Sequence, residues 1–141
     1  MAILVQQMVE SDVSAVAFSV NPITGDPEQV MVTSAWGLGE SVVYGIVTPD
    51  TYVVQRPAMA VAERWLASKD VMTVFTEDGT EEIEVPAERR TASSLMDSEL
   101  IEIARLATKL ERSMGWPTDI ECAYAYGELY LLQCRPITTL R

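Results

Sequence analysis

Four polar residues near the carboxyl terminus are spaced so that two neighbouring strands would gather them on one face. Asp119 and Glu121 are two residues apart, as are Gln133 and Arg135, and strand residues two apart share a face of the sheet. An antiparallel hairpin that turns near Gly127 can place Glu121 opposite Gln133 and Asp119 opposite Arg135. A one-residue slip without a bulge would split the four side chains between the two faces.

This group of side chains is open to two interpretations. Carboxylate and amide oxygens are the hard ligands that Mg²⁺ prefers, and a neighbouring arginine suits a phosphate because its guanidinium donates parallel hydrogen bonds. The simpler alternative is a cross-strand ion pair between Asp119 and Arg135 on a solvated face. Spacing alone favours the ion pair.

Three further segments have less specific patterns. The glycine-rich stretch Ala35–Glu40 lacks the Gly-Lys-Ser/Thr of a P-loop, and Val42 stands where a dinucleotide fingerprint needs glycine. We therefore expect a tight turn whose glycines pack against Trp36. The run Val5–Val9 fits an edge strand, or a backbone that reads the edge of an adenine, and its sequence does not decide between them. Lys69 is expected to be a solvated lysine.

Composition excludes several classes of function. The chain has 141 residues, no histidine, two cysteines and a net charge of −11, so Ser-His or Cys-His dyads, His-ligated zinc and a phosphohistidine carrier cannot reside in it. Cys122 and Cys134 are expected to be free thiols. Ten basic residues without a basic stripe argue against nucleic acid as a partner. No apolar stretch approaches the roughly 20 residues of a membrane span, so we expect no membrane partner and a cytoplasmic location.

The elements that position these residues follow from periodicity and turn chemistry. Apolar residues at three- and four-residue steps predict one main helix near 97–114, with Asp97 as N-cap and Gly115 ending it. Strands are expected at 2–8, 13–20, 30–34 and 51–55, a hairpin at 71–76 and 80–85, and a final pair at 120–126 and 129–134. With 48% apolar residues, the chain is predicted to fold as one α+β unit with a mostly antiparallel sheet.

Six segments in order resemble one family, the pyruvate phosphate dikinase and phosphoenolpyruvate synthase family, in its N-terminal ATP-grasp nucleotide-binding region. They cover nearly the whole chain and include Trp-Gly-Leu-Gly-Glu and Gln-Cys-Arg-Pro-Ile-Thr; their ranges are 2–9, 14–19, 34–45, 48–50, 119–121 and 132–138. The chain ending also looks like that of rifampicin phosphotransferase. Each motif is weak alone, whereas the ordered set is specific and outweighs the simpler interpretations above.

The resemblance implies a fold and a set of site residues. Residues 1–141 would be part of an ATP-grasp domain, its C-terminal subdomain, with ATP and Mg²⁺ as cofactors. By analogy with the family, Gln6 lies on the hinge strand beside adenine, and Glu121 and Gln133 contact ATP and its Mg²⁺. Asp119 would support the metal site, and Arg135 would contact the phosphoryl group in transfer as the catalytic residue.

The family resemblance also implies partners. Its enzymes need the remaining ATP-grasp subdomain, a swivelling domain whose His accepts the phosphoryl group, and a domain that binds phosphoenolpyruvate and pyruvate. We therefore expect half of an active site, either a piece of a longer enzyme or a small subunit, inactive alone. Two alternatives stay open: the same half-site in a phosphotransferase acting on rifampicin or phenol, and a non-catalytic acidic binding module. The Gly37–Glu40 loop and Lys69 match family positions without an assigned role, and Cys122 stands where relatives often carry Trp, which would alter packing beside the metal site.

Overall fold

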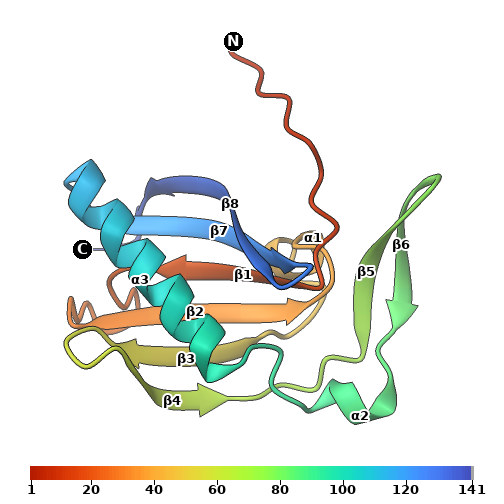
Figure 1. Cartoon of the computed structure of the whole chain (residues 1–141), viewed down its shortest axis with the longest axis horizontal. Helices are drawn as coiled ribbons and strands as arrows, with labels where there is room; N and C mark the ends of the chain where they lie inside the picture. Colours follow the sequence, from red (N-terminus) through yellow and green to blue (C-terminus); the bar gives the residue numbers. More distant parts are fainter. Residues whose placement is uncertain (141) are drawn as a thin grey trace.

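The sheet and one long helix make up most of the structure (Figure 1). The computed structural model describes residues 1–140. A six-stranded antiparallel sheet has the order β4-β3-β2-β1-β7-β8, and β5 and β6 form a separate hairpin. This is the predicted α+β class. The elements are β1 Val13–Phe18, β2 Gln29–Trp36, α1 Glu40–Val43, β3 Asp50–Gln55, β4 Ala60–Trp65, β5 Val71–Thr76, β6 Gly79–Glu84, α2 Ala87–Arg90, α3 Asp97–Met114, β7 Thr118–Ala125 and β8 Glu128–Pro136.

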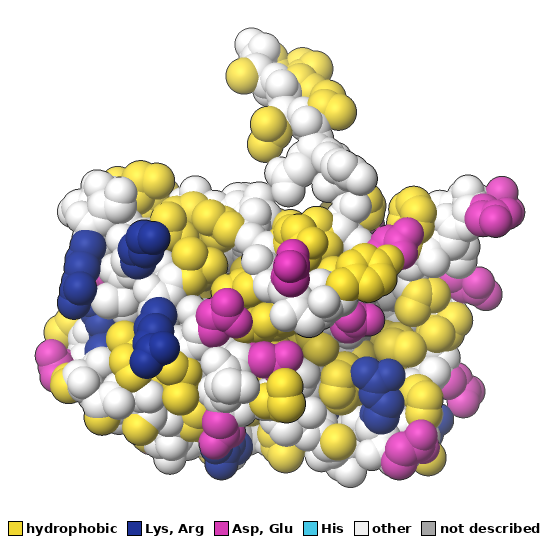
Figure 2. Space-filling model, in the orientation of Figure 1, with side chains coloured by type: hydrophobic (Ala, Val, Ile, Leu, Met, Phe, Trp, Pro, Cys, Tyr) yellow, Lys and Arg dark blue, Asp and Glu magenta, His cyan; other side chains and the backbone are white. Residues whose placement is uncertain are grey.

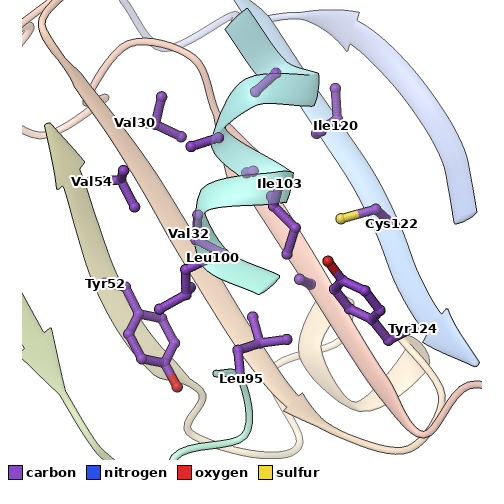
Figure 3. Packing of buried hydrophobic residues seen from close by; sticks show 14 of the residues in the cluster. Val30, Val32, Tyr52, Val54, Leu95, Leu100, Ile103, Ile120, Cys122 and Tyr124 are labelled. Atoms are coloured by element: carbon purple, nitrogen blue, oxygen red, sulfur yellow. The ribbon is translucent and has the colours of Figure 1, made fainter. Parts of the chain in front are cut away.

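Helix α3 crosses one face of the sheet and forms the core with it (Figures 1 and 3). Its apolar stripe, which includes Leu100, Ile103 and Ala107, is fully buried against β1, β2, β3 and β7. Removing such a stripe from water is the main force that holds a helix on a sheet. The predicted bounds 97–114 are confirmed, and Gly115 ends the helix in a left-handed conformation at φ 78°.

The N-cap of α3 differs from the prediction by one residue. Met96, rather than Asp97, is the N-cap. The Glu99 carboxylate accepts a hydrogen bond of 2.7 Å from the Met96 backbone N–H, and Asp97 instead forms an ion pair with Arg64 on β4. A carboxylate three residues into the helix can return to the cap position, which leaves the preceding acid free for another contact.

The second face of the sheet has no comparable cover among residues 1–140. Asp119 on β7 lies opposite Phe18 on β1, and Phe18 lies opposite Met31 on β2, so one row of side chains crosses this face. The short helix α1 lies near one end of it, where Val42 lines a small cavity with Glu121. We call this surface the open face.

The strand predicted at 2–8 is wrong for this chain. Residues 1–12 form no helix or strand, and Ile3, Leu4 and Val5 have exposed fractions of 78%, 85% and 91%. Figure 2 shows this segment projecting from the body with apolar side chains along it. Its composition suits a strand, but a strand needs a hydrogen-bonded neighbour, and no described residue forms a backbone hydrogen bond with residues 2–8.

The other predicted strands are confirmed, with small changes of boundary. Three elements had no clear signal in the sequence: the edge strand β4, whose side chains are largely exposed, and the single-turn helices α1 and α2. Short or exposed elements lack a hydrophobic period long enough to identify them. No helix among residues 1–140 is both long and apolar enough to cross a membrane.

Candidate functional site

The β7–β8 hairpin brings together the four residues singled out by spacing. Glu121 lies opposite Gln133, and Asp119 lies opposite Arg135, as predicted. The register, however, depends on a bulge between Glu121 and Cys122, where Leu132 is the extra residue of β8. Without the bulge, the register set at the turn would place Glu121 opposite Leu132 instead of Gln133. Glu121 and Gln133 would then lie on opposite faces of the sheet, as would Asp119 and Arg135. The bulge therefore sets the composition of the site.

Asp119 and Arg135 form the ion pair that spacing favoured. The Arg135 Nε–H donates to Asp119 Oδ2 at 2.8 Å, and this contact with Asp119 raises the pKa of Arg135. The two side chains differ in environment, because that of Asp119 is 10% exposed and that of Arg135 is 55% exposed. The pair leaves Asp119 Oδ1 buried without a hydrogen-bond partner among residues 1–140.

The unpartnered oxygen tests whether the site suits a metal ion. A buried carboxylate oxygen without a donor is unfavourable, and native structures satisfy nearly all such atoms. Glu121 and Gln133 offer further oxygens on the same face, whereas no cluster of three or more Asp, Glu, His or Cys side chains suited to a metal lies among residues 1–140. Mg²⁺ needs only one or two protein carboxylates, because it keeps several waters or phosphate oxygens. The donor set fits Mg²⁺ bound together with a phosphate.

A groove connects this hairpin to the N-terminal segment. It has a volume of about 200 Å³, and its walls include Gln6, Met8, Glu40 and Leu132. A small cavity beside it shares Gly39 and Leu132 and reaches Glu121. The bulge residue Leu132 therefore lines both the groove that contains Gln6 and the cavity that contains Glu121. Pockets for nucleotide-sized ligands usually have about 300–1,000 Å³, so this groove is only one wall of such a pocket.

The glycine-rich loop forms the far wall of the groove, but its packing partner is not Trp36. Gly37, at φ 78°, lies so close to β5 that a Cβ atom there would be 2.3 Å from the Thr73 carbonyl oxygen. Leu38 N–H donates to that oxygen at 2.8 Å, and Ser14 Oγ donates to the Gly37 carbonyl at 2.7 Å. The Trp36 ring is covered instead by Arg89, whose guanidinium lies 4.0 Å from the ring centroid.

Lys69 is a buried residue, and the expectation of a solvated lysine is wrong. Its Nζ donates to Asp50 Oδ1 at 2.7 Å and to the Ala67 carbonyl at 3.0 Å, and neither charged side chain is exposed. Asp50 also accepts hydrogen bonds from Tyr52 and Ser94. No local pattern around Lys69 predicts this burial, although Asp50 belongs to segment 48–50, one of the six that support the resemblance.

The two cysteines are free thiols, as expected. Cys122 lies on the core side of β7, where Figure 3 shows it pointing toward α3. Burial raises its pKa to about 12. Because alternate residues of a strand face opposite sides, Cys122 does not pack beside Asp119 and Glu121. Any effect of residue 122 on the metal site would act through the core, and that effect stays a prediction.

A larger cavity of about 450 Å³ lies elsewhere on the open face, over β2, β3 and β4. Its walls include Met31, Val53, Glu63 and Trp65, and none of the predicted site residues. Its apolar walls offer few groups for a phosphate. The chemistry-bearing residues are gathered at the β7–β8 hairpin instead.

Comparison with known proteins identifies the family of the chain. The family model described as "Pyruvate phosphate dikinase, AMP/ATP-binding domain" matches residues 1–141. The chain is 40% identical to a probable phosphoenolpyruvate synthase of Methanocaldococcus jannaschii, over 100% of this chain and 12% of the relative. It is 41% identical to the phosphoenolpyruvate synthase of Pyrococcus furiosus, over 98% of this chain and 18% of the relative. It is 38% identical to the uncharacterized phosphotransferase YvkC of Bacillus subtilis, over 99% of this chain and 17% of the relative.

These matches cover almost all of this chain, but the chain spans less than a fifth of the length of these curated relatives. The family model, in contrast, matches the chain from end to end. The chain belongs to the pyruvate phosphate dikinase AMP/ATP-binding domain family.

Proposed function

We propose that this chain is the Mg·ATP-binding half-site of a phosphoenolpyruvate synthase-like dikinase, formed by the C-terminal subdomain of an ATP-grasp domain. One observation carries the proposal: Asp119 Oδ1 is buried and unpartnered, on the face of the sheet that also carries the side-chain oxygens of Glu121 and Gln133. A divalent cation would satisfy this oxygen, and the nucleotide phosphates would complete the coordination of the cation.

Each site residue then has a role that matches its position. Asp119, Glu121 and Gln133 hold the metal, and the latter two also contact ATP. Gln6, from the groove beside the bulge, borders the adenine. Arg135 donates hydrogen bonds to the phosphoryl group in transfer, which suits its exposed guanidinium at the rim of the hairpin. Bound Mg²⁺ would supply charge neutralisation of the phosphates.

The site needs other parts of a longer enzyme. The groove is one wall only, the open face carries no long helix among residues 1–140, and the relatives are several times longer. We infer that a second ATP-grasp subdomain closes over the nucleotide, that a His on a swivelling domain receives the phosphoryl group, and that a further domain passes it to pyruvate. Phosphoryl transfer depends on positioning and charge from both sides, so the chain alone is expected to be inactive.

A second candidate is the same half-site in another phosphotransferase. The similarity to YvkC, which is named a phosphotransferase without a stated acceptor, supports this alternative. The residues of the half-site contact the donor nucleotide, so they are compatible with pyruvate, rifampicin or phenol as the acceptor. A non-catalytic acidic module is the third possibility, and it predicts no response to nucleotide.

The test is Mg·ATP binding by calorimetry, with the chain alone and with the rest of its enzyme. Glu121→Gln and Arg135→Gln are expected to weaken binding about tenfold or more, because each removes a charge-assisted contact to the metal or the phosphates. Glu63→Gln is the matched control, because it removes one carboxylate from the same open face at the distant β4 edge.

Two results would contradict the proposal. The first is the absence of any nucleotide binding when the chain is joined to the rest of its enzyme. The second is equal loss of affinity in Glu121→Gln and Glu63→Gln, because the effect would then reflect overall charge rather than contact. Turnover assays with pyruvate, rifampicin and phenol as acceptors separate the first two candidates.

A further inference from the structure

Arg135, which we assign to the phosphates, contacts Asp119, which we assign to the metal. Arg135 Nε–H donates to Asp119 Oδ2 at 2.8 Å, while Oδ1 of the same carboxylate is buried and unpartnered. A guanidinium and a divalent cation at a single carboxylate repel each other, because both are positive. In the described arrangement, the Arg135 guanidinium therefore binds the carboxylate that the metal would also bind.

The two partners differ in their freedom to move. Asp119 is on β7, an interior strand with β1 on one side and β8 on the other, and only 10% of its side chain is exposed. The Arg135 side chain is 55% exposed, and long arginine side chains at a surface have several accessible rotamers. Any exchange at this carboxylate must proceed by movement of Arg135.

We propose that Arg135 is an exchangeable counter-ion of Asp119: a divalent cation that binds Asp119 displaces the guanidinium, which then becomes available to the phosphates. The displacement rests on the contacts above, and only its last step rests on the proposed function. Metal binding would thereby be coupled to phosphate binding by Arg135, because the guanidinium leaves Asp119 only when a metal occupies the site.

This coupling predicts effects of opposite sign for one substitution. Arg135→Gln removes the competitor, so affinity for a divalent cation alone is expected to rise about fivefold, as suits a partly exposed ion pair. Affinity for the metal-nucleotide complex is expected to fall, because the contact to the phosphates is lost. A residue that only stabilised the fold would not strengthen metal binding.

The experiment measures Mn²⁺ binding to the 141-residue chain by loss of the free-ion EPR signal, with Mg²⁺ as competitor and no nucleotide. Arg64→Gln is the matched control. It removes one positive charge from an exposed pair with Asp97, in which the side chains are 43% and 64% exposed. Asp119→Asn, alone and combined with Arg135→Gln, completes a double-mutant cycle.

The expected result is tighter Mn²⁺ binding in Arg135→Gln than in Arg64→Gln, with the gain abolished by Asp119→Asn. Equal gains in the two arginine variants, or undetectable Mn²⁺ binding in every variant, would overturn the proposal. A measurement on the unaltered chain is independent of variant folding: the Nε–H NMR resonance of Arg135 should shift on Mg²⁺ addition, and an unchanged resonance at saturating metal would also overturn it. If the metal displaces Arg135 but no nucleotide ever binds, the exchange stands and the proposed function fails.

Discussion

Removing either member of the buried Asp50–Lys69 pair is expected to destabilise the fold strongly and unequally. Lys69→Met leaves the Asp50 carboxylate with hydrogen bonds from the Ala67 backbone, Tyr52 and Ser94. Asp50→Ala leaves the Lys69 ammonium buried with one neutral acceptor, the Ala67 carbonyl. Breaking a buried pair typically costs about 3–5 kcal/mol. We expect about 3 kcal/mol for Lys69→Met and at least about 4 kcal/mol for Asp50→Ala, because its remaining charge is less well satisfied.

The double variant separates the charge from the packing. In Asp50→Ala/Lys69→Met no ammonium stays buried, so this protein should be more stable than Asp50→Ala alone, by about 1–2 kcal/mol. Urea denaturation followed by circular dichroism measures these differences. Thermal melts should show a corresponding order, with about 3 °C per kcal/mol for a domain of this size.

The order of the variants is the critical result. Two results would refute the reasoning. The first is a free energy of unfolding of Lys69→Met within about 0.5 kcal/mol of that of the unaltered protein. The second is an Asp50→Ala variant that is no less stable than Lys69→Met. Arg64→Met is a suitable control, because it breaks an exposed ion pair with Asp97 and should change stability by less than about 1 kcal/mol.

Three further predictions concern backbone geometry, a thiol and a helix cap. Gly37→Ala should lower the free energy of unfolding by more than about 3 kcal/mol. Gly127→Ala, also at positive φ but with nothing within 4 Å of a new Cβ, should lower it by only about 1–2 kcal/mol. Equal losses of stability in urea denaturation would refute the close approach of the loop to β5. Burial raises the pKa of Cys122 from 9.0 to about 12. The stability that this thiol contributes is therefore complete below pH 9 and declines by about 1.4 kcal/mol per pH unit up to pH 12. Urea denaturation across this pH range should show a smaller loss of unfolding free energy for Cys122→Ala than for the unaltered protein. Glu99→Ala should cost about 1 kcal/mol through the lost contact to the Met96 N–H, and Asp97→Ala clearly less, in thermal melts of the two variants side by side.

Local sequence was sufficient for the elements that have a clear period or turn. The bounds of helix α3 were predictable because its apolar side chains repeat at helical spacing and Gly115 follows, although the N-cap lies one residue earlier than predicted. The Asp-Gly step identified the β5–β6 hairpin. Edge strand β4 has no such signal, because its exposed residues show no alternation. The strand predicted at 2–8 fails for a different reason: a suitable composition does not supply a pairing partner.

The sequence by itself determined which chemical groups the site contains: two carboxylates, an amide and a guanidinium at two-residue spacing, in a chain without histidine. Only the tertiary structure decided how they are arranged, because the Leu132 bulge sets the register and burial leaves one oxygen of Asp119 unpartnered. It also decided that Lys69 is buried, since its Nζ meets Asp50 on β3 and its backbone N–H meets the Arg90 carbonyl, both far from it in the sequence. Periodicity and turn chemistry are local properties, whereas the burial of a charge depends on segments far apart in sequence.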